Sequence, residues 1–160
     1  MKITKKVAVV HCAGGCLTED GQNACRFGCI GCGKCVEACR LHAVEIDEEK
    51  GAAHVDRAKC VGCGKCAAAC PQGVIRIELR EDKIQPLCSN GDAGAAAKKV
   101  CPNSCISCGM CVKKCPSGAI SLENNVPVIN ENRCIVCGMC AAVCPRGVIR
   151  DADGIITERY

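Results

Sequence analysis

The chain contains the stretch Cys29-Ile30-Gly31-Cys32-Gly33-Lys34-Cys35-Val36-Glu37-Ala38-Cys39. Its cysteines follow the spacing C-x2-C-x2-C-x3-C, and this spacing returns three more times within 160 residues. The other copies are Cys60, Cys63, Cys66 and Cys70; Cys105, Cys108, Cys111 and Cys115; and Cys134, Cys137, Cys140 and Cys144. Proline follows the last cysteine in three copies, as Pro71, Pro116 and Pro145, whereas Arg40 stands there in the first.

This spacing is that of the ligand runs of bacterial ferredoxins. Three cysteines wrap one iron–sulfur cube, and a fourth lies one helical turn further, where it is offered to a neighbouring cube. The pattern therefore predicts an α+β fold of tandem two-cluster ferredoxin units, with short hairpins and short helices around [4Fe–4S] clusters. The crossed sets that we expect are Cys29, Cys32, Cys35 with Cys70; Cys60, Cys63, Cys66 with Cys39; Cys105, Cys108, Cys111 with Cys144; and Cys134, Cys137, Cys140 with Cys115.

The chain is an internal duplication, which predicts two halves, residues 1–80 and 81–160. Adding 76 to Cys12, Cys25 or Cys29 reaches another cysteine, and adding 74 does so for Cys60 and Cys70. Hydrophobic patterning predicts strands over residues 6–10, 44–47, 53–56, 74–79, 119–122, 126–129, 148–150 and 155–157, and an apolar edge over 84–87. Helices are expected over residues 33–40, 64–69 and 92–100, the last with Asp92 in its first turn.

Five cysteines lie outside the four runs: Cys12, Cys16, Cys25, Cys88 and Cys101. Two repeat-related pairs, Cys12 with Cys88 and Cys25 with Cys101, supply enough thiolates for a fifth cube that bridges the halves. Cys16 is then spare. Two alternatives remain open: a set of Cys12, Cys16 and Cys25 with one cysteine of the other half, or buried free thiols.

Composition argues that clusters replace a conventional hydrophobic core. Apolar residues make up 49% of the chain, yet Phe27 and Tyr160 are its only aromatic residues. The formal net charge of +4 counts every thiol as neutral. With twenty thiolates bound to five cubes, the net charge of the loaded chain becomes roughly −6. The composition therefore gives no reason to expect a nucleic-acid partner.

Cysteine usage and the N-terminal sequence indicate the compartment. A secreted chain with 21 cysteines would suggest disulfides, but residues 1–10 lack the long apolar core of a signal peptide. No apolar run reaches the ~18 residues of a membrane span. We therefore expect a soluble protein of a reducing cytoplasm.

The flanking segments resemble those of one family. They are Val9-Val10-His11-Cys12-Ala13-Gly14-Gly15, Ala24-Cys25-Arg26-Phe27-Gly28-Cys29, Cys88-Ser89, Lys99-Val100-Cys101 and Cys105-Ile106-Ser107-Cys108. With the four runs they are similar to the B subunit of the Rnf electron-transport complex, without its N-terminal membrane helix. The resemblance implies a subunit that relays electrons from or to soluble ferredoxin.

The favoured function is an electron relay with no catalytic residue. The expected partners are catalytic subunits of an oxidoreductase, with soluble ferredoxin as a second candidate. The alternative is an iron–sulfur enzyme subunit with chemistry at or beside a cluster, and a zinc or nucleic-acid module is disfavoured because zinc sites pair CxxC units across longer gaps. Lys34 and Lys65 precede third cysteines where the second half has Met110 and Met139, which predicts that the first-half clusters are easier to reduce.

Overall fold

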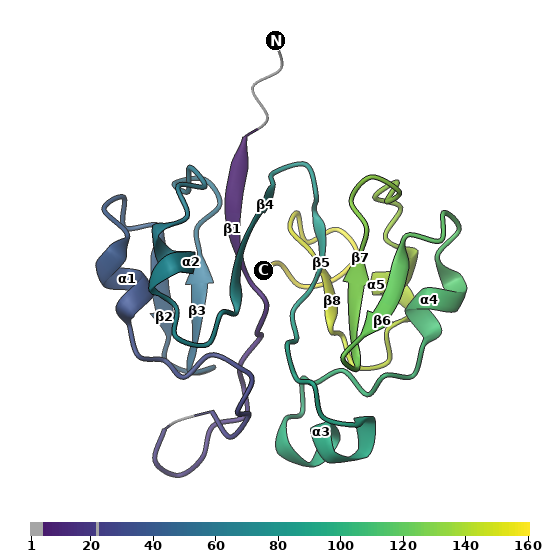
Figure 1. The fold of residues 1–160 in the computed structure, drawn as a ribbon, viewed down its shortest axis with the longest axis horizontal. Coiled ribbons are helices and arrows are strands. Elements are labelled where there is room, and N and C mark those ends of the chain that lie inside the picture. Colours follow the sequence, from purple (N-terminus) through teal and green to yellow (C-terminus); the bar gives the residue numbers. More distant parts are fainter. Residues whose placement is uncertain (1–4, 22) are drawn as a thin grey trace. The chain divides into compact units, whose positions relative to one another are not determined.

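The computed structural model describes residues 5–21 and 23–160. The chain divides into two compact units, Met1–Glu81 and Asp82–Tyr160, and each is built from short strands and helices (Figure 1). Short hairpins and short helices in two repeated units agree with the predicted α+β fold class.

The first unit is closed by pairing its first strand with its last. Its elements are β1 (Lys6–Val10), α1 (Lys34–Ala38), β2 (Val44–Asp47), β3 (Ala52–Val55), α2 (Lys65–Ala69) and β4 (Ile75–Leu79). β1 runs antiparallel to β4, β2 and β3 form a hairpin, and α1 packs against α2. The four buried residues that follow Lys6 explain why β1 lies inside the unit.

The second unit repeats this order and adds one helix. Its elements are β5 (Ile84–Pro86), α3 (Gly94–Val100), α4 (Met110–Lys114), β6 (Ile120–Glu123), β7 (Val126–Ile129), α5 (Met139–Val143) and β8 (Ile149–Asp151). β5 pairs with β8 and β6 with β7, both antiparallel. The strand register keeps the offsets of the sequence repeat, because Ala8 faces Ile77 and its counterpart Ile84 faces Asp151.

Each core consists of small aliphatic side chains packed around buried cysteines. In the first unit Val44, Val74 and Ile75 pack with Cys35 and Cys66. In the second, the corresponding core is Ile84, Ile120, Ala141 and Ile149 with Cys111 and Cys140. The cysteines are therefore part of the packing as well as candidate ligands.

Four of the helices begin after a glycine in the left-handed conformation. Gly33, Gly64, Gly109 and Gly138 have φ between 71° and 80°. A residue with a Cβ adopts this conformation at a cost, which explains the glycine after each second cysteine. None of the helices within the described residues is long and apolar enough to span a membrane.

Three predicted elements differ from the structure. The helix expected over residues 33–40 is confined to Lys34–Ala38, because Cys39 has an extended backbone. Residues 155–157 form bends rather than a strand, because backbone N–H groups of Asp153, Ile155 and Ile156 donate to the Asp151 carboxylate. The helix predicted from Asp92 begins at Gly94, so no acidic side chain lies in its first turn. A Cβ at Gly94 would overlap the backbone of Ile106, so this helix start requires a glycine.

Candidate iron–sulfur sites

A left-handed residue before the second cysteine shapes each run. These residues are Gly31 (φ 65°), Gly62 (φ 67°), Ser107 (φ 54°) and Val136 (φ 55°). In this conformation the N–H groups of Gly31, Ser107 and Val136 each donate to the Sγ of the first cysteine of their run, at 3.4 Å. The loop therefore folds around the sulfur atom of the first cysteine, which is a candidate cluster ligand.

In the first unit, the last cysteine of each run lies beside the other run. Burial raises the pKa of Cys35 to about 11, and the charges of the first cysteine of its run and of Cys70 add to this shift. Burial likewise raises the pKa of Cys66, with contributions from the first cysteine of its run and from Cys39. Such repulsion requires the thiols to be close neighbours.

The second unit repeats the exchange. Burial raises the pKa of Cys105 to about 11, and the charges of Cys88, Cys111 and Cys144 add to this effect. Burial also raises the pKa of Cys140 to about 11, in part through the charge of Cys115. α4 packs against α5 as α1 packs against α2, which brings the last cysteine of each run to the other run.

Two cavities are each lined by a complete crossed set. One has a volume of about 240 Å³, and its sulfur atoms come from Cys39, Cys60, Cys63 and Cys66. The other, of about 20 Å³, is lined by Cys105, Cys108, Cys111 and Cys144. The second cavity holds little more than one water molecule, and the Cys108 side chain at its edge is exposed. Cys32 and Cys137, the second cysteines of the remaining sets, are exposed.

These donor sets fit [4Fe–4S] clusters. Burial raises the pKa of Cys35, Cys105 and Cys140, so the protein alone does not stabilise these ligands as thiolates. Burial acts in the same direction on Cys115, but hydrogen bonds from the Ser117 hydroxyl and from backbone N–H groups outweigh it, so the pKa of Cys115 is instead lowered. A cationic iron core supplies that stabilisation, because ligating thiols are deprotonated by the metal. No three metal-binding side chains within the described residues converge on a single-ion site. None of the 21 cysteines, all of which are described, forms a disulfide.

Backbone amides point at the candidate ligands, a feature that cysteine spacing alone did not reveal. The donors are Ala8 to Cys60, Ala43 to Cys39 and Ala119 to Cys115 at 3.3 Å, and Val148 to Cys144 at 3.4 Å. Such hydrogen bonds to sulfur influence the reduction potential of a bound cluster. The pair Ala43 and Ala119 is related by the offset of 76, so this contact belongs to the repeat.

One further amide donor, the N–H of Ala53, is present in the first unit only. Cys29 accepts hydrogen bonds from the N–H groups of Gly31 and Ala53, both at 3.4 Å. The position related to Ala53 is Pro127, which faces Leu122 as Ala53 faces Ile46. Proline has no N–H, so the sulfur of Cys105 lacks this donor.

Two cysteines outside the runs, Cys12 and Cys88, each lie beside the first cysteine of their own half. Burial raises the pKa of Cys12 to about 11, opposed by N–H groups of Cys29 and Gly14 and assisted by the charges of Cys29 and Cys25. A Cβ at Gly28 would lie 3.0 Å from the Cys12 sulfur, so glycine permits this close approach.

The same arrangement holds for Cys88. Its sulfur accepts N–H groups from Asn90 and Cys105, both at 3.4 Å. Cys101 is buried, and its carbonyl oxygen accepts the Ser104 hydroxyl at 2.9 Å. The bridging cube of Cys12, Cys25, Cys88 and Cys101 requires both units and stays a prediction.

Cys16 has a different environment. Asn23 Nδ2 donates to the carbonyl oxygens of Gly51 at 2.7 Å and Cys29 at 3.1 Å, which fixes the orientation of the amide. Asn23 Oδ1 therefore faces the backbone N–H of Cys16 at 3.2 Å and its Sγ at 3.3 Å. An S–H group of Cys16 can donate to this oxygen, so we expect Cys16 to be a structural residue rather than a cluster ligand.

Models of 4Fe-4S dicluster domains match three overlapping parts of the chain. The matched ranges are residues 28–74, 59–120 and 104–149. Together they include all four cysteine runs. The predicted [4Fe–4S] chemistry is therefore supported independently of the geometry, although the number of clusters is not.

Three B subunits of oxidoreductase complexes are similar in sequence to this chain. The B subunit of the Na(+)-translocating ferredoxin:NAD(+) oxidoreductase complex of Acetobacterium woodii is 36% identical over 145 residues, which is 79% of this chain and 43% of that protein. The B subunit of the proton-translocating ferredoxin:NAD(+) oxidoreductase complex of Clostridium ljungdahlii is 37% identical over 81% of this chain and 52% of that protein. The B subunit of the ion-translocating oxidoreductase complex of Methanosarcina acetivorans is 38% identical over 58% of this chain and 35% of that protein.

The chain thus spans about half or less of the length of these relatives. A chain of the formate dehydrogenase–heterodisulfide reductase–formylmethanofuran dehydrogenase complex of Methanospirillum hungatei matches at 22% identity over 77% of this chain and 51% of that chain. Its TM-score of 0.30 is too low to support an argument. The resemblance to the Rnf B subunit is confirmed: the chain is an iron–sulfur protein of 4Fe-4S dicluster ferredoxin domains and a homologue of the B subunits of ion-translocating oxidoreductase complexes.

Proposed function

We propose that this iron–sulfur electron-transfer protein relays single electrons between a ferredoxin-like carrier and the catalytic subunits of an oxidoreductase in the cytoplasm. The observation that supports the proposal is that, in each unit, a cavity is lined by three cysteines of one run and the last cysteine of the other. With this exchange, two clusters within a unit would be close neighbours, as an electron relay requires. The names of the relatives, ferredoxin:NAD(+) oxidoreductase complex subunits, support both kinds of partner.

In this proposal the crossed sets hold four [4Fe–4S] clusters, and Cys12, Cys25, Cys88 and Cys101 hold a fifth. A bound cluster supplies a one-electron couple. The residues of the chain hold it through thiolates, direct amide N–H groups at the sulfur atoms and exclude water with small aliphatic side chains. No side chain acts as an acid, a base or a nucleophile in a relay.

The alternative proposal is an enzyme subunit whose substrate reacts at or beside a cluster. The cavity of about 240 Å³ at Cys39, Cys60, Cys63 and Cys66 is the feature that keeps it under consideration. Its lining is mostly apolar and consists of main chain, aliphatic side chains, thiols and two cations, Arg40 and Lys65. Such a lining offers a substrate few groups for acid–base chemistry.

The test is an anaerobic redox titration of the full chain after reconstitution with iron and sulfide. A relay is expected to show broad visible absorbance that bleaches on reduction and returns fully on oxidation. At least four reducing equivalents per chain are expected, one for each cluster.

The matched control is the variant Cys70→Ser, which removes one crossed ligand. We expect it to change the electron paramagnetic resonance spectrum or the iron content of one cluster and leave the others intact. Zinc in place of iron, or absorbance that does not return on oxidation, contradicts the relay. Product formation from a substrate by the isolated chain supports the enzyme alternative instead.

A further inference from the structure

The internal repeat allows each surface residue of one unit to be compared with its counterpart in the other. Around the candidate site of Cys39, Cys60, Cys63 and Cys66, cations of the first half are replaced by acidic or neutral residues in the second. The related pairs are Lys5 and Glu81, Lys6 and Asp82, Arg40 and Pro116, Lys65 and Met139, and Arg80 and Gly154. The two halves have therefore diverged in charge at the mouth of one site.

The five cations line two adjoining hollows of the first unit. The cavity of about 240 Å³ is bordered by Arg40 and Lys65. An open groove of about 580 Å³ is bordered by Lys5, Lys6 and Arg80. Both hollows also include Cys60 and Val61, so the cations surround one candidate cluster ligand. We call this surface the basic face.

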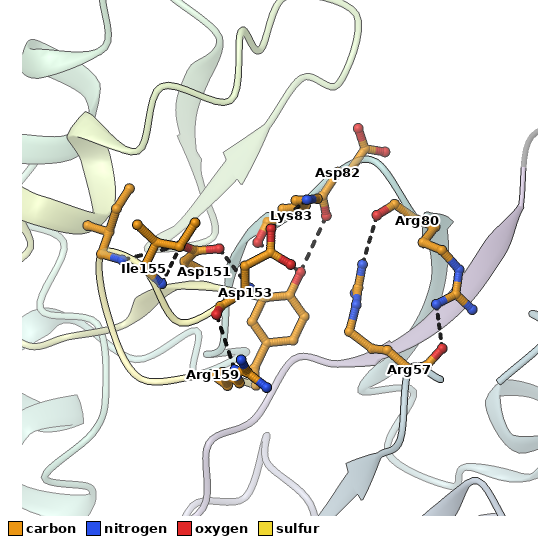
Figure 2. A network of polar contacts seen from close by, with 10 residues as sticks. Arg57, Arg80, Asp82, Lys83, Asp151, Asp153, Ile155 and Arg159 are labelled. Atoms are coloured by element: carbon orange, nitrogen blue, oxygen red, sulfur yellow. Dashed lines mark hydrogen bonds and ion pairs between the residues drawn. The ribbon is translucent and has the colours of Figure 1, made fainter. Parts of the chain in front are cut away.

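Close backbone packing and hydrogen bonds fix the conformation of the basic face. Gly62 packs so closely on the backbone of Lys6 that a Cβ would lie 2.6 Å from its carbonyl carbon. Figure 2 shows Arg57 and Arg80 each donating to the backbone carbonyl oxygen of the other, the first at 2.9 Å. Arg80 also donates to the carbonyl oxygen of Cys60 at 2.7 Å, which fixes a positive charge beside the cysteine run.

The face combines charge with exposed apolar side chains. Val61 is 64% exposed and Leu41 is 49% exposed. Among the described residues, no ion pair involves Lys5, Lys6, Arg40 or Lys65. Apolar side chains within a ring of unneutralised cations are typical of a protein docking surface, with charges steering the encounter and apolar contacts at its centre.

In the second unit, part of the related surface is contacted by the end of the chain. A Cβ at Gly138, the counterpart of Gly64, would overlap the side chain of Ile156. The Tyr160 hydroxyl donates toward the carbonyl oxygens of Asp82 at 3.3 Å and Lys83 at 3.1 Å. Ile156 and Tyr160 thus lie beside the counterparts of Gly64 and Lys6, while Ile135, the counterpart of Val61, remains 64% exposed.

We propose that the basic face is the docking surface for an acidic electron-carrier protein, which exchanges electrons at the site of Cys39, Cys60, Cys63 and Cys66. The inference rests on the proposed relay function and assigns its entry point. Exposed Val61 and Leu41 and the extent of the two hollows favour a protein surface over a small anion. In the exchange the carrier loses or gains one electron, the chain gains or loses the same electron, and no covalent bond changes.

The test measures binding to an acidic flavodoxin, a one-electron carrier whose flavin absorbance differs from that of clusters. The cluster-loaded full chain is compared with Lys5→Glu combined with Lys6→Glu, which gives these positions the sign of their counterparts. We expect the dissociation constant at low salt to increase about tenfold, a change of ~1.4 kcal/mol, and the salt dependence of binding to weaken.

The matched control is Lys98→Glu combined with Lys99→Glu, the same charge change on the exposed side of α3. It should bind within about twofold of the unaltered chain. Zero-length carbodiimide cross-linking, followed by mass spectrometry, should join flavodoxin carboxylates to Lys5, Lys6 or Lys65. Equal weakening by both double variants, or cross-links confined to other lysines, overturns the proposal.

The result is separable from the relay function. Dithionite reduces the clusters without any docking. If the chain is reduced reversibly but the charge reversal does not weaken flavodoxin binding, the relay function stands and the proposed docking surface is wrong. Displacement of flavodoxin by millimolar inorganic phosphate would instead assign the basic face to a small anion and overturn the proposal as well.

Discussion

At the scale of single residues, Ala53 and Pro127 give the two units different cluster environments. Ala53 donates its N–H to the Cys29 sulfur at 3.4 Å, and Pro127 at the related position has no N–H to donate. A hydrogen bond to a ligand sulfur stabilises the more negative, reduced cluster. This difference acts in the same direction as the effect predicted for the positive charges of Lys34 and Lys65, unless solvent and salt screen those two lysines.

We therefore predict that Ala53→Pro lowers the midpoint potential of one first-unit cluster. The expected shift is tens of millivolts, where about 60 mV is a tenfold change for a one-electron couple. Strand β3 should tolerate the change, since β7 already contains proline at this position. Redox titration followed by electron paramagnetic resonance measures the shift, and Pro127→Ala should raise a second-unit potential. Unchanged potentials in both variants would show that this amide has no influence.

Cys16 gives a second prediction at this scale. Because its sulfur faces the Asn23 acceptor, a serine hydroxyl can replace the thiol as donor. We expect Cys16→Ser to retain the full iron content of the chain. Asn23→Leu, which leaves the carbonyl oxygens of Cys29 and Gly51 without their donor, should destabilise the fold by about 1–3 kcal/mol. Loss of iron from Cys16→Ser would instead identify Cys16 as a ligand.

At the scale of elements, the loop before α5 contains a strained residue. Val136 has φ 55°, the conformation that glycine adopts at Gly31 and Gly62. Branched side chains rarely adopt it, and the cost is about 1–2 kcal/mol. The N–H that this conformation directs at the Cys134 sulfur explains why the strain is retained.

We predict that Val136→Gly stabilises the cluster-loaded protein by about 0.5–1 kcal/mol, once the higher entropy of glycine in the unfolded chain is subtracted. The temperature at which visible cluster absorbance disappears should rise. Ile135→Gly is the matched control, because it removes an exposed side chain without relieving a positive φ. A rise of equal size in the control would rule out strain relief as the cause.

The segment after β8 depends on one carboxylate. Burial raises the pKa of Asp151, but N–H groups of Asp153, Ile155 and Ile156 and the charge of Lys83 outweigh it and lower the pKa below its usual range. A lowered folded pKa means that the carboxylate stabilises the fold above the unfolded value of about 3.9. This contribution disappears as the pH falls through the folded pKa.

Asp151→Asn should therefore be less stable than the unaltered chain between about pH 5 and pH 7, by a constant amount. The difference should shrink below about pH 4. The urea concentration at half loss of cluster absorbance, measured for both proteins across this range, checks the prediction. Asp153→Asn, which alters an exposed carboxylate in the same turn, is the control and should show a smaller difference. A stability difference that grows toward acid pH would contradict the assignment.

At the scale of the whole molecule, the cysteines outside the runs decide the number of clusters. Cys12 and Cys88 each lie beside the first cysteine of their half and accept the N–H of that residue. If they form a fifth cube with Cys25 and Cys101, the loaded chain holds about twenty irons rather than about sixteen. Such a cube would link the units covalently through iron.

Iron analysis of the anaerobically reconstituted chain, with and without Cys88→Ser and Cys101→Ser together, tests this set. We expect the double variant to lose about four irons per chain. Cys16→Ser is the matched thiol-to-hydroxyl control and should lose none. About sixteen irons in the unaltered chain, or no loss in the double variant, would rule out the bridging cube.

Local spacing was enough for the sequence by itself to predict the four cysteine runs, the helices within the first two of them and the inner hairpins. The corresponding helices α4 and α5 of the second half were not predicted. The predicted strand 44–47 is β2 without change, and the strand over residues 126–129 is β7. Ligand spacing and strand alternation act over a few residues, so they can be read without knowledge of distant contacts. The offsets of 76 and 74 also carried over directly into the strand register.

Only the tertiary structure decided which distant residues meet. It paired β1 with β4 and left residues 155–157 outside the sheet, where the Asp151 carboxylate accepts their amides. It also brought the N–H of Ala53 to the Cys29 sulfur, 24 positions away in the chain. Gly62 packs against the backbone of Lys6, a contact that forms part of the basic face. These contacts join residues far apart in the chain, and hydrogen bonds from main-chain amides carry no signature in residue type.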